Sequence, residues 1–352
     1  MNGIVIKEQS LRKFARSILI AFGAEASEAD SVASAMVWSD RMGRQNYGVW
    51  RLPIFTKRLS LGLIKSPCCP RFRKTAPAVG VLDGDQGFGH LVGQTAMRRA
   101  MELARQSGVG LVCVNNSNHF CAGAYYAQLA VEANMIGLVM SNSYPLVAAF
   151  GGRKPVLGTN PLAFGAPRRN GRSVLIDMAT SASSGSNVRK SAEGKKKLSE
   201  NIGLDKRGRL TTDPGQVAAL LPFGGAKGFC LGTMVEIFCG VLTGAGISYG
   251  VKSTYHNFQE ACNNGHFFQV LDIAKFMPLE TYYARMETLV DSLLTSGKPG
   301  AVRVPGEHRW IARDQSLREG IRLDGATVKS LEALAEKVGL AVPWQQKVKE
   351  RS

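Results

Sequence analysis

Short apolar runs separated by helical stretches constrain the fold of this chain most. Residues 110–114 (GLVCV) and 136–140 (IGLVM) contain no alternating polar positions. Such runs are typical of strands that are covered on both faces of a sheet. Helical stretches over 89–107 and 123–134 alternate with the strand-like runs. The pattern therefore predicts an α/β fold with β-α-β alternation.

Helices are also predicted toward both ends of the chain. Residues 7–42 carry apolar positions at helical spacing with a break at Gly23, which predicts a helical hairpin. Residues 277–294 and 325–338 are predicted to form amphipathic helices, and 228–246 an apolar helix with regularly spaced glycines.

The composition is that of a compact globular protein, with 45% hydrophobic and 20% charged residues in 352. The N-terminus lacks a signal-peptide pattern, and the apolar run over 18–22 is too short to span a bilayer. We therefore expect a cytoplasmic protein without a membrane segment. Seven cysteines without C-x2-C spacing indicate neither a disulfide framework nor a zinc site, so no metal is expected.

The formal net charge of +17 is the most unusual bulk property. Eight Lys/Arg against three acids fall within residues 189–209, where no aromatic residue offers a base a stacking surface. The segment is predicted to be a solvated loop that attracts an anionic cofactor or substrate. Nucleic acid is the disfavoured partner.

Neither standard phosphate-binding loop occurs in the sequence. The glycine-rich GGAKG at 224–228 matches neither G-x-G-x-x-G nor G-x-x-x-x-G-K-[ST]. A standard Rossmann domain is therefore not supported.

Polar residues follow two of the predicted strands. The segment NNSNH at 115–119 joins a strand to a helix, at the sheet edge where α/β proteins collect ligands. Its His119 suits proton transfer near neutral pH, and helix capping is the alternative. Another strand ends at Asp177, before serines and threonines that suit a ribose or pyrophosphate; a structural acid and an ordinary serine-rich turn are the alternatives.

An ordered set of motifs occurs in the second and third parts of the chain. SNHF, LGTNP, DMATS, LTTDP, LLP-x-GG-x-KG and VPGE occur in this order between residues 117 and 307. In this order the motifs resemble the malate/L-lactate dehydrogenase-like family, which includes malate, lactate, ureidoglycolate and sulfolactate dehydrogenases of type 2.

The resemblance implies a fold that is not the Rossmann fold. A central mixed sheet domain, expected over 73–270, would bind an extended NAD or NADP. Residues 1–72 and 271–352 would together form a helical domain. The resemblance also implies a homodimer, with the substrate near the junction of the domains.

The resemblance implies specific site residues. His119 would be catalytic or face the nicotinamide, and Thr159 would contact the substrate. The residues expected at the cofactor are His119, Phe120, Asn142, Asp177, Met178, Ala179, Gly225, Lys227, Gly306, Glu307 and His308. Lys227 with Gly224 and Gly225 would offer a pyrophosphate a cation and backbone donors, although a surface lysine is the alternative.

The sequence departs from the family pattern near the N-terminus. The family motif approximates R-G-x-x-S-H-G-x-x-R-L-P, and this chain has Asn46 and Tyr47 in place of Ser and His. Arg51 matches the family arginine and is expected to bind the substrate carboxylate, with a helix-surface arginine as the alternative. Asn46 is expected to contact the substrate.

Three explanations of the changed pair stay open. Tyr47 donates the proton, with a pKa lowered by a nearby cation or the nicotinamide. Alternatively, His119 does the acid/base work alone and Tyr47 only hydrogen-bonds the substrate. In the third, the protein is a catalytically altered family member that binds cofactor without turning over family substrates.

The expected activity is NAD(P)-dependent hydride transfer to or from a small acidic metabolite. A 2-oxo acid, a 2-hydroxy acid and a cyclic imine 2-carboxylate all offer Arg51 the same carboxylate. The excess of basic residues slightly favours NADP, because its 2'-phosphate needs Arg or Lys.

Overall fold

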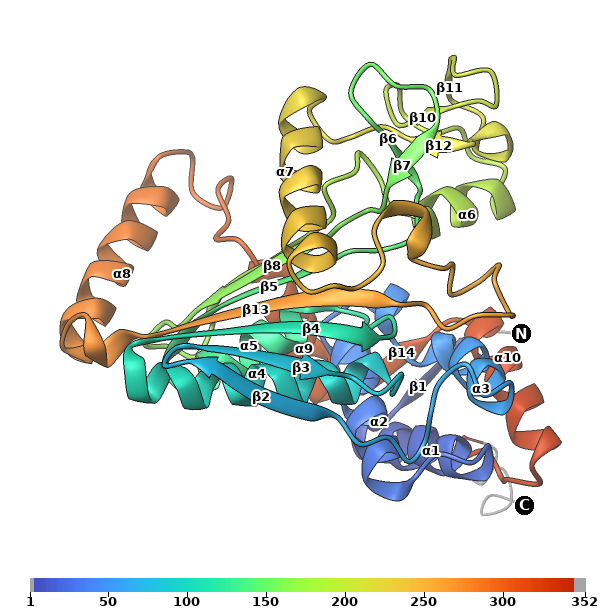
Figure 1. Cartoon of the computed structure of the whole chain (residues 1–352), viewed down its shortest axis with the longest axis horizontal. Coiled ribbons are helices and arrows are strands. Elements are labelled where there is room, and N and C mark those ends of the chain that lie inside the picture. Colours follow the sequence, from blue (N-terminus) through green and yellow to red (C-terminus); the bar gives the residue numbers. More distant parts are fainter. Residues whose placement is uncertain (1–2, 345–352) are drawn as a thin grey trace.

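The computed structural model describes residues 3–344. Its centre is a seven-stranded mixed sheet in which only the β3–β4 pair is parallel (Figure 1). In spatial order the strands are β2 (Arg71–Ala76), β3 (Val79–Asp83), β4 (Val109–Ser117), β13 (Asn264–Asp272), β5 (Met135–Ser141), β8 (Leu162–Ala166) and β9 (Val174–Met178).

Helices cover both faces of this sheet. On one face, α4 (Gly89–Ser107) and α5 (Gly123–Glu132) share an apolar core with β4, β13 and β5. A second cluster joins Cys113, Met140 and Phe267 of the sheet to α7 (Ala226–Glu236) and to the π-helical turn η4 (Ile237–Val241). The runs without polar alternation are therefore strands buried between two layers, as predicted.

A smaller sheet lies above the large one in Figure 1, beside α7 and α6 (Gly185–Glu193). Its strands, in spatial order, are β11 (Leu210–Thr211), β10 (Gly203–Leu204), β12 (Ala219–Leu220), β6 (Val147–Ala148) and β7 (Pro155–Leu157). The 3-10 turns η3 (Pro214–Gln216) and η5 (Ser248–Gly250) belong to the connections of this region.

The two chain ends pack together. Strand β1 (Ile4–Ile6) pairs antiparallel with β14 (Ile321–Leu323). One apolar core joins these strands to the surrounding helices. Its helices are α1 (Glu8–Ala21), α2 (Ala26–Arg41), α3 (Leu52–Ser60) and α10 (Gly325–Lys337).

Two further helices complete the described chain. Helix α9 (Glu307–Glu319) docks Trp310 in the core beneath the large sheet, where the indole N–H donates to the Ser173 carbonyl at 2.8 Å. Helix α8 (Leu279–Thr295) follows the short turn η6 (Ile273–Lys275) and stands away from the sheet (Figure 1). No helix within residues 3–344 is long and apolar enough to cross a membrane.

Several expectations are confirmed and others need correction. The hairpin over 7–42 is α1 and α2, and the mixed central sheet is present. The basic segment is not a simple loop, because α6 includes its first residues and β10 its later ones. The helix predicted over 228–246 ends in the π turn at 241.

The order of the central strands also differs from a simple β-α-β succession, because β13 inserts antiparallel between β4 and β5. The expected domain boundaries fall inside strands β2 and β13. The division into domains stays a prediction.

Candidate active site

Arg51 lies at the entrance of α3, where Pro53 near the first helical position supports the helix start. The residue is 5% exposed. Its Nε donates to the Asn46 carbonyl at 2.7 Å, whereas its buried Nη1 has no hydrogen-bond partner among the described residues. A buried guanidinium is costly without an anion, so the free Nη1 marks a place for one.

Aromatic rings surround the Arg51 guanidinium. Its Cζ lies 5.1 Å from the ring centre of Tyr47, 5.3 Å from that of Trp50 and 5.6 Å from that of Tyr255. Within residues 3–344 no Asp or Glu forms an ion pair with Arg51. The ring faces stabilise the cation without neutralising its charge.

Tyr47 lies in the 3-10 turn η1 (Gln45–Tyr47), directly before η2 (Val49–Arg51). Burial and then the negative charge of Asp177 raise the pKa of Tyr47, and the charges of Arg51 and Arg44 lower it by less. The direction is opposite to the lowered pKa expected for a tyrosine donor, because desolvation of the phenolate outweighs the two cations. Tyr47 is therefore a protonated phenol at neutral pH.

His119 lies in the turn between β4 and α5, as predicted. Its Nδ1 accepts the Cys121 backbone N–H at 3.1 Å, which assigns the ring proton to Nε2. Burial and then the charge of Arg51 lower the pKa of His119 well below its usual value. The imidazole is thus neutral and offers an Nε2–H donor.

Asp177 is buried at the end of β9, with a side chain that is 3% exposed. Its Oδ2 accepts the Ala124 N–H at 3.3 Å, at the N-terminus of α5, and lies 3.8 Å from Arg309 Nη1. These contacts are those of a structural acid at a helix start. Its cofactor role stays a prediction.

A second set of predicted residues lies around the start of α7. Gly225 is the N-cap of α7 and Lys227 is exposed in its first turn. Gly224 and Gly225 have φ of 56° and 67°, which other residues rarely adopt. The Gly225 N–H already donates to the Pro222 carbonyl at 3.3 Å, so an anion at this helix start would be bound by the neighbouring N–H groups and by Lys227.

Thr159 is expected at the substrate and Asn142 at the cofactor, and both make contacts within the protein. The Thr159 hydroxyl lies 3.3 Å from that of Ser143. The Asn142 side chain donates to the Gly246 carbonyl at 2.8 Å and accepts the Gly265 N–H at 3.0 Å. The Asn142 side-chain amide therefore already makes hydrogen bonds that stabilise the start of β13.

The remaining predicted residues lie along β9 and α9. Met178 ends β9, and Ala179 follows it. Gly306 is the N-cap of α9 with φ of 92°, Glu307 accepts the Val304 N–H at 3.2 Å, and His308 is exposed. Phe120 is buried and stacks on His266, with ring centres 4.4 Å apart.

Two residues near Arg51 have no sequence motif, and a third was marked only by charge. Tyr255 contacts Arg51 from a loop distant in sequence, and Arg189, the first residue of the basic segment 189–209, contacts Tyr255. Asp40 is buried at the end of α2, where its Oδ2 accepts the Val49 N–H at 2.9 Å. An acid within an apolar helix face was the one available signal for Asp40.

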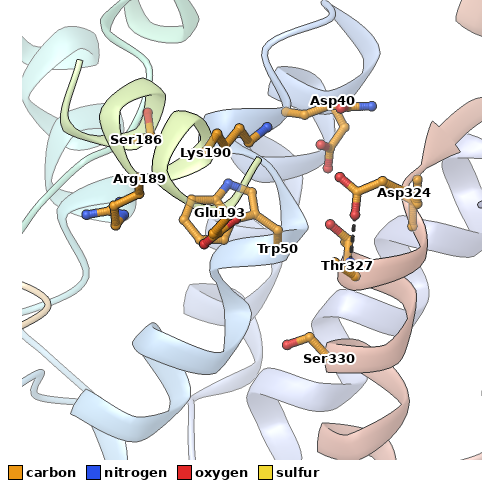
Figure 2. Close-up of a pocket in the computed structure, with 12 residues that line it drawn as sticks. Asp40, Trp50, Ser186, Arg189, Lys190, Glu193, Asp324, Thr327 and Ser330 are labelled. Carbon is orange, nitrogen blue, oxygen red and sulfur yellow. Dashed lines mark hydrogen bonds between the residues drawn. The ribbon is translucent and has the colours of Figure 1, made fainter. Parts of the chain in front are cut away.

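A cavity of about 230 Å³ adjoins this cluster (Figure 2). Trp50, Arg189 and Lys190 line it, together with Asp40 and Asp324. Trp50 is shared by the cavity lining and by the rings around Arg51, whereas Arg51, Tyr47 and Tyr255 do not line the cavity.

Comparison with known proteins identifies the family to which this chain belongs. The sequence model of the malate/L-lactate dehydrogenase family matches residues 6–332. The chain belongs to that family.

Individual relatives and a solved structure agree with the family match. The chain is 35% identical over 330 residues to L-sulfolactate dehydrogenase from Methanothermobacter thermautotrophicus, covering 93% of this chain and 95% of the relative. It is 31% identical to a Delta(1)-pyrroline-2-carboxylate/Delta(1)-piperideine-2-carboxylate reductase from Pseudomonas syringae pv. tomato, covering 91% and 93%. The solved malate dehydrogenase of Pyrococcus horikoshii superposes with a TM-score of 0.88 at 31% identity, covering 97% of both chains.

These comparisons confirm the family resemblance and the fold. The relatives are oxidoreductases of small 2-hydroxy acids or cyclic imine carboxylates, which supports an enzyme of this kind. The roles of the individual site residues stay predictions.

Proposed function

We propose that the protein transfers hydride between NAD(P) and a small 2-oxo/2-hydroxy acid or cyclic imine 2-carboxylate. The observation that carries the proposal is the buried Arg51 guanidinium, with its free Nη1 and no acid partner. A substrate carboxylate would satisfy this cation with a charge-assisted hydrogen bond.

The start of α7 fits the diphosphate of a nicotinamide cofactor. Gly224 offers a backbone N–H group and the exposed Lys227 offers a cation, whereas the Gly225 N–H already donates to the Pro222 carbonyl at 3.3 Å. A bound nicotinamide would supply or accept the hydride. One relative is named an NAD(+)-dependent ureidoglycolate dehydrogenase, whereas the basic composition favours NADP. The proposal therefore includes both cofactors.

Tyr47 is the proposed proton donor. His119 holds its proton on Nε2 while Nδ1 accepts a backbone N–H, so a cationic imidazole would have to break that hydrogen bond. A neutral imidazole can still orient the reacting oxygen through Nε2–H. Tyr47 is protonated at neutral pH, and Arg51 and Arg44 would stabilise its phenolate after proton transfer.

The test is oxidation of NADPH and NADH, followed by absorbance, with pyruvate, oxaloacetate and Δ1-pyrroline-2-carboxylate. We expect Tyr47→Phe to lower kcat for the oxo acids by about 100-fold or more, and to affect the imine less because its nitrogen is already basic. Tyr283→Phe, which changes a phenol on α8 far along the chain, is the matched control.

Other outcomes assign the roles differently. If the His119→Ala variant loses its activity while the Tyr47→Phe variant stays active, His119 is the proton donor. If no substrate turns over while the cofactor still quenches protein fluorescence, the catalytically altered family member replaces the proposed enzyme.

A further inference from the structure

A second buried arginine, Arg58, lies on α3 about two turns beyond Arg51. The residue is 0% exposed, and within residues 3–344 it forms no ion pair with an acid. A guanidinium is costly to bury unless an anion or hydrogen bonds satisfy it. The partners of Arg58 therefore indicate what this charge does in the fold.

The hydrogen bonds of Arg58 go to backbone carbonyls of the loop between η5 and β13. Its Nη1 donates to the Asn257 carbonyl at 2.6 Å and, more weakly, to the Thr254 carbonyl at 3.4 Å. Its Nη2 donates to the Glu260 carbonyl at 2.9 Å. Because Thr254 and Asn257 flank Tyr255, the planar guanidinium anchors the chain on both sides of this tyrosine.

The base of this loop, which comprises residues 252–262, is closed by its own hydrogen bonds. The Lys252 N–H donates to the Cys262 carbonyl at 2.8 Å. The Cys262 N–H donates to the side-chain oxygen of Asn118 at 3.3 Å, in the turn between β4 and α5. The loop is therefore fixed at its base by Asn118 and farther out by Arg58.

The loop brings Tyr255 against Arg51. The Tyr255 ring centre lies 5.6 Å from Cζ of Arg51, so the ring stabilises the cation and limits where the guanidinium can point. Helix α3 thus carries Arg51 and, through Arg58, also holds the loop that restrains Arg51. A shift of the loop would let the guanidinium turn and would weaken a hydrogen bond to a carboxylate, because such a bond depends on geometry.

We propose that Arg58 is a positioning residue that holds Tyr255 against Arg51 and so sets the affinity of Arg51 for the substrate carboxylate. This inference rests on the proposed function, in which Arg51 binds that carboxylate. Arg58 itself contacts no substrate and takes no part in hydride or proton transfer. Its effect should therefore fall on KM and not on kcat.

The test is Arg58→Lys, which keeps the charge but loses the planar fork that reaches several carbonyls at once. We expect KM for pyruvate to rise about 10-fold, the effect of one lost charged hydrogen bond, and kcat to stay within about twofold. Hydrogen exchange over residues 252–262 should become faster. Leu19→Ala, which removes a buried side chain from the core of the chain ends, is the control for lost stability and should leave KM unchanged.

A double-mutant cycle tests whether Arg58 acts through Tyr255. Tyr255→Ala removes the positioned ring and should itself raise KM. In the Tyr255→Ala protein, Arg58→Lys should raise KM by less than about twofold further, because the ring that Arg58 holds is gone. A full further increase of about 10-fold would mean that Arg58 acts in another way, and would overturn the inference.

The outcomes distinguish this inference from the proposed function. A KM that stays at the wild-type value in Arg58→Lys, or a loss confined to kcat, overturns the positioning role while the oxidoreductase stands. If the wild-type protein reduces no substrate, the proposed function fails. Calorimetric titration with L-lactate then decides: weaker binding by Arg58→Lys than by the wild type retains the positioning role, and equal binding or no binding overturns it.

Discussion

The carboxyl group of Asp40 is buried beneath the turn that carries Tyr47 and Arg51. It accepts the Val49 N–H, and Gly48 packs so closely on it that a Cβ there would lie 1.8 Å from Oδ1. Burial raises the pKa of Asp40 to about 8, and its hydrogen bond with Val49 lowers it by less. Asp40 is thus a protonated acid at neutral pH.

This shift predicts a stability that falls with rising pH. Between about pH 4 and pH 8 the folded protein keeps a proton that the unfolded chain releases, so the contribution is present at low pH and is lost as pH rises through the folded pKa. The Asp40→Asn variant should lack this part of the loss of stability with rising pH. Thermal unfolding from pH 5 to pH 9 measures it, with Asp30→Asn in a surface ion pair as control. Parallel curves for Asp40→Asn and wild type would contradict the assignment.

The donor assignment predicts the pH profile of reduction. If the phenol of Tyr47, with its raised pKa, supplies the proton, kcat/KM for a 2-oxo acid should stay level from about pH 6 to 9. A decline in kcat/KM over the whole of this range would instead follow the lowered pKa of His119, because only the protonated imidazole could donate. Steady-state rates across this range distinguish the two.

At the scale of elements, β4 and α4 approach through a glycine. A Cβ on Gly110 of β4 would lie 1.9 Å from the Ala100 carbonyl oxygen of α4. The Ala100 oxygen and the Gly110 Cα that would carry the Cβ both belong to backbone in the buried core, so neither can move away without shifting an element. This contact fixes the spacing that places His119 at the end of β4.

Gly110→Ala should therefore destabilise the fold. We expect a loss of about 1–3 kcal/mol or more in the free energy of unfolding, the range of overpacked cores. Gly250→Ala has no atom within 4 Å of the added Cβ and should stay within about 0.5 kcal/mol of wild type. Urea unfolding measures both variants, and an unchanged midpoint for Gly110→Ala would contradict the close approach.

At the scale of the whole molecule, the apolar face of α8 is largely uncovered within the described chain, and its contacts to the sheet are polar ones such as Arg168–Glu287 and Tyr283–Asn134. Of its 17 residues, Val290 alone is buried, and Leu289, Leu293 and Leu294 are exposed. Exposed apolar patches on a stable protein are typical of interaction surfaces. Because the family resemblance implies a homodimer, we expect a second copy to cover this helix.

Light scattering should then give about twice the chain mass of 37.9 kDa. Leu289→Lys should shift the mass toward the monomer by placing a charge in the interface. Leu210→Lys, at an exposed site of β11, should leave it unchanged. A monomeric wild-type protein would end the dimer expectation.

The sequence alone determined the elements whose signal is local. Helical periodicity marked α1 and α2, because side chains that face a core repeat with the period of the helix. Continuous apolar runs marked β4 and β5, because both faces of these strands are covered. The ordered motifs identified the family. Comparison with the family motif near the N-terminus also showed that Asn46 and Tyr47 replace its Ser and His. The turn before α5 likewise singled out His119.

Only the tertiary structure decided which distant segments meet. Strand β13 lies between β4 and β5, because interstrand hydrogen bonds join segments whose pairing leaves no local pattern. In the same way, the packing of a loop brings Tyr255 to Arg51, and the packing of α6 brings Arg189 to Tyr255. The raised pKa values of Asp40 and Tyr47 also depend on burial, which is a property of the folded chain and not of the residue.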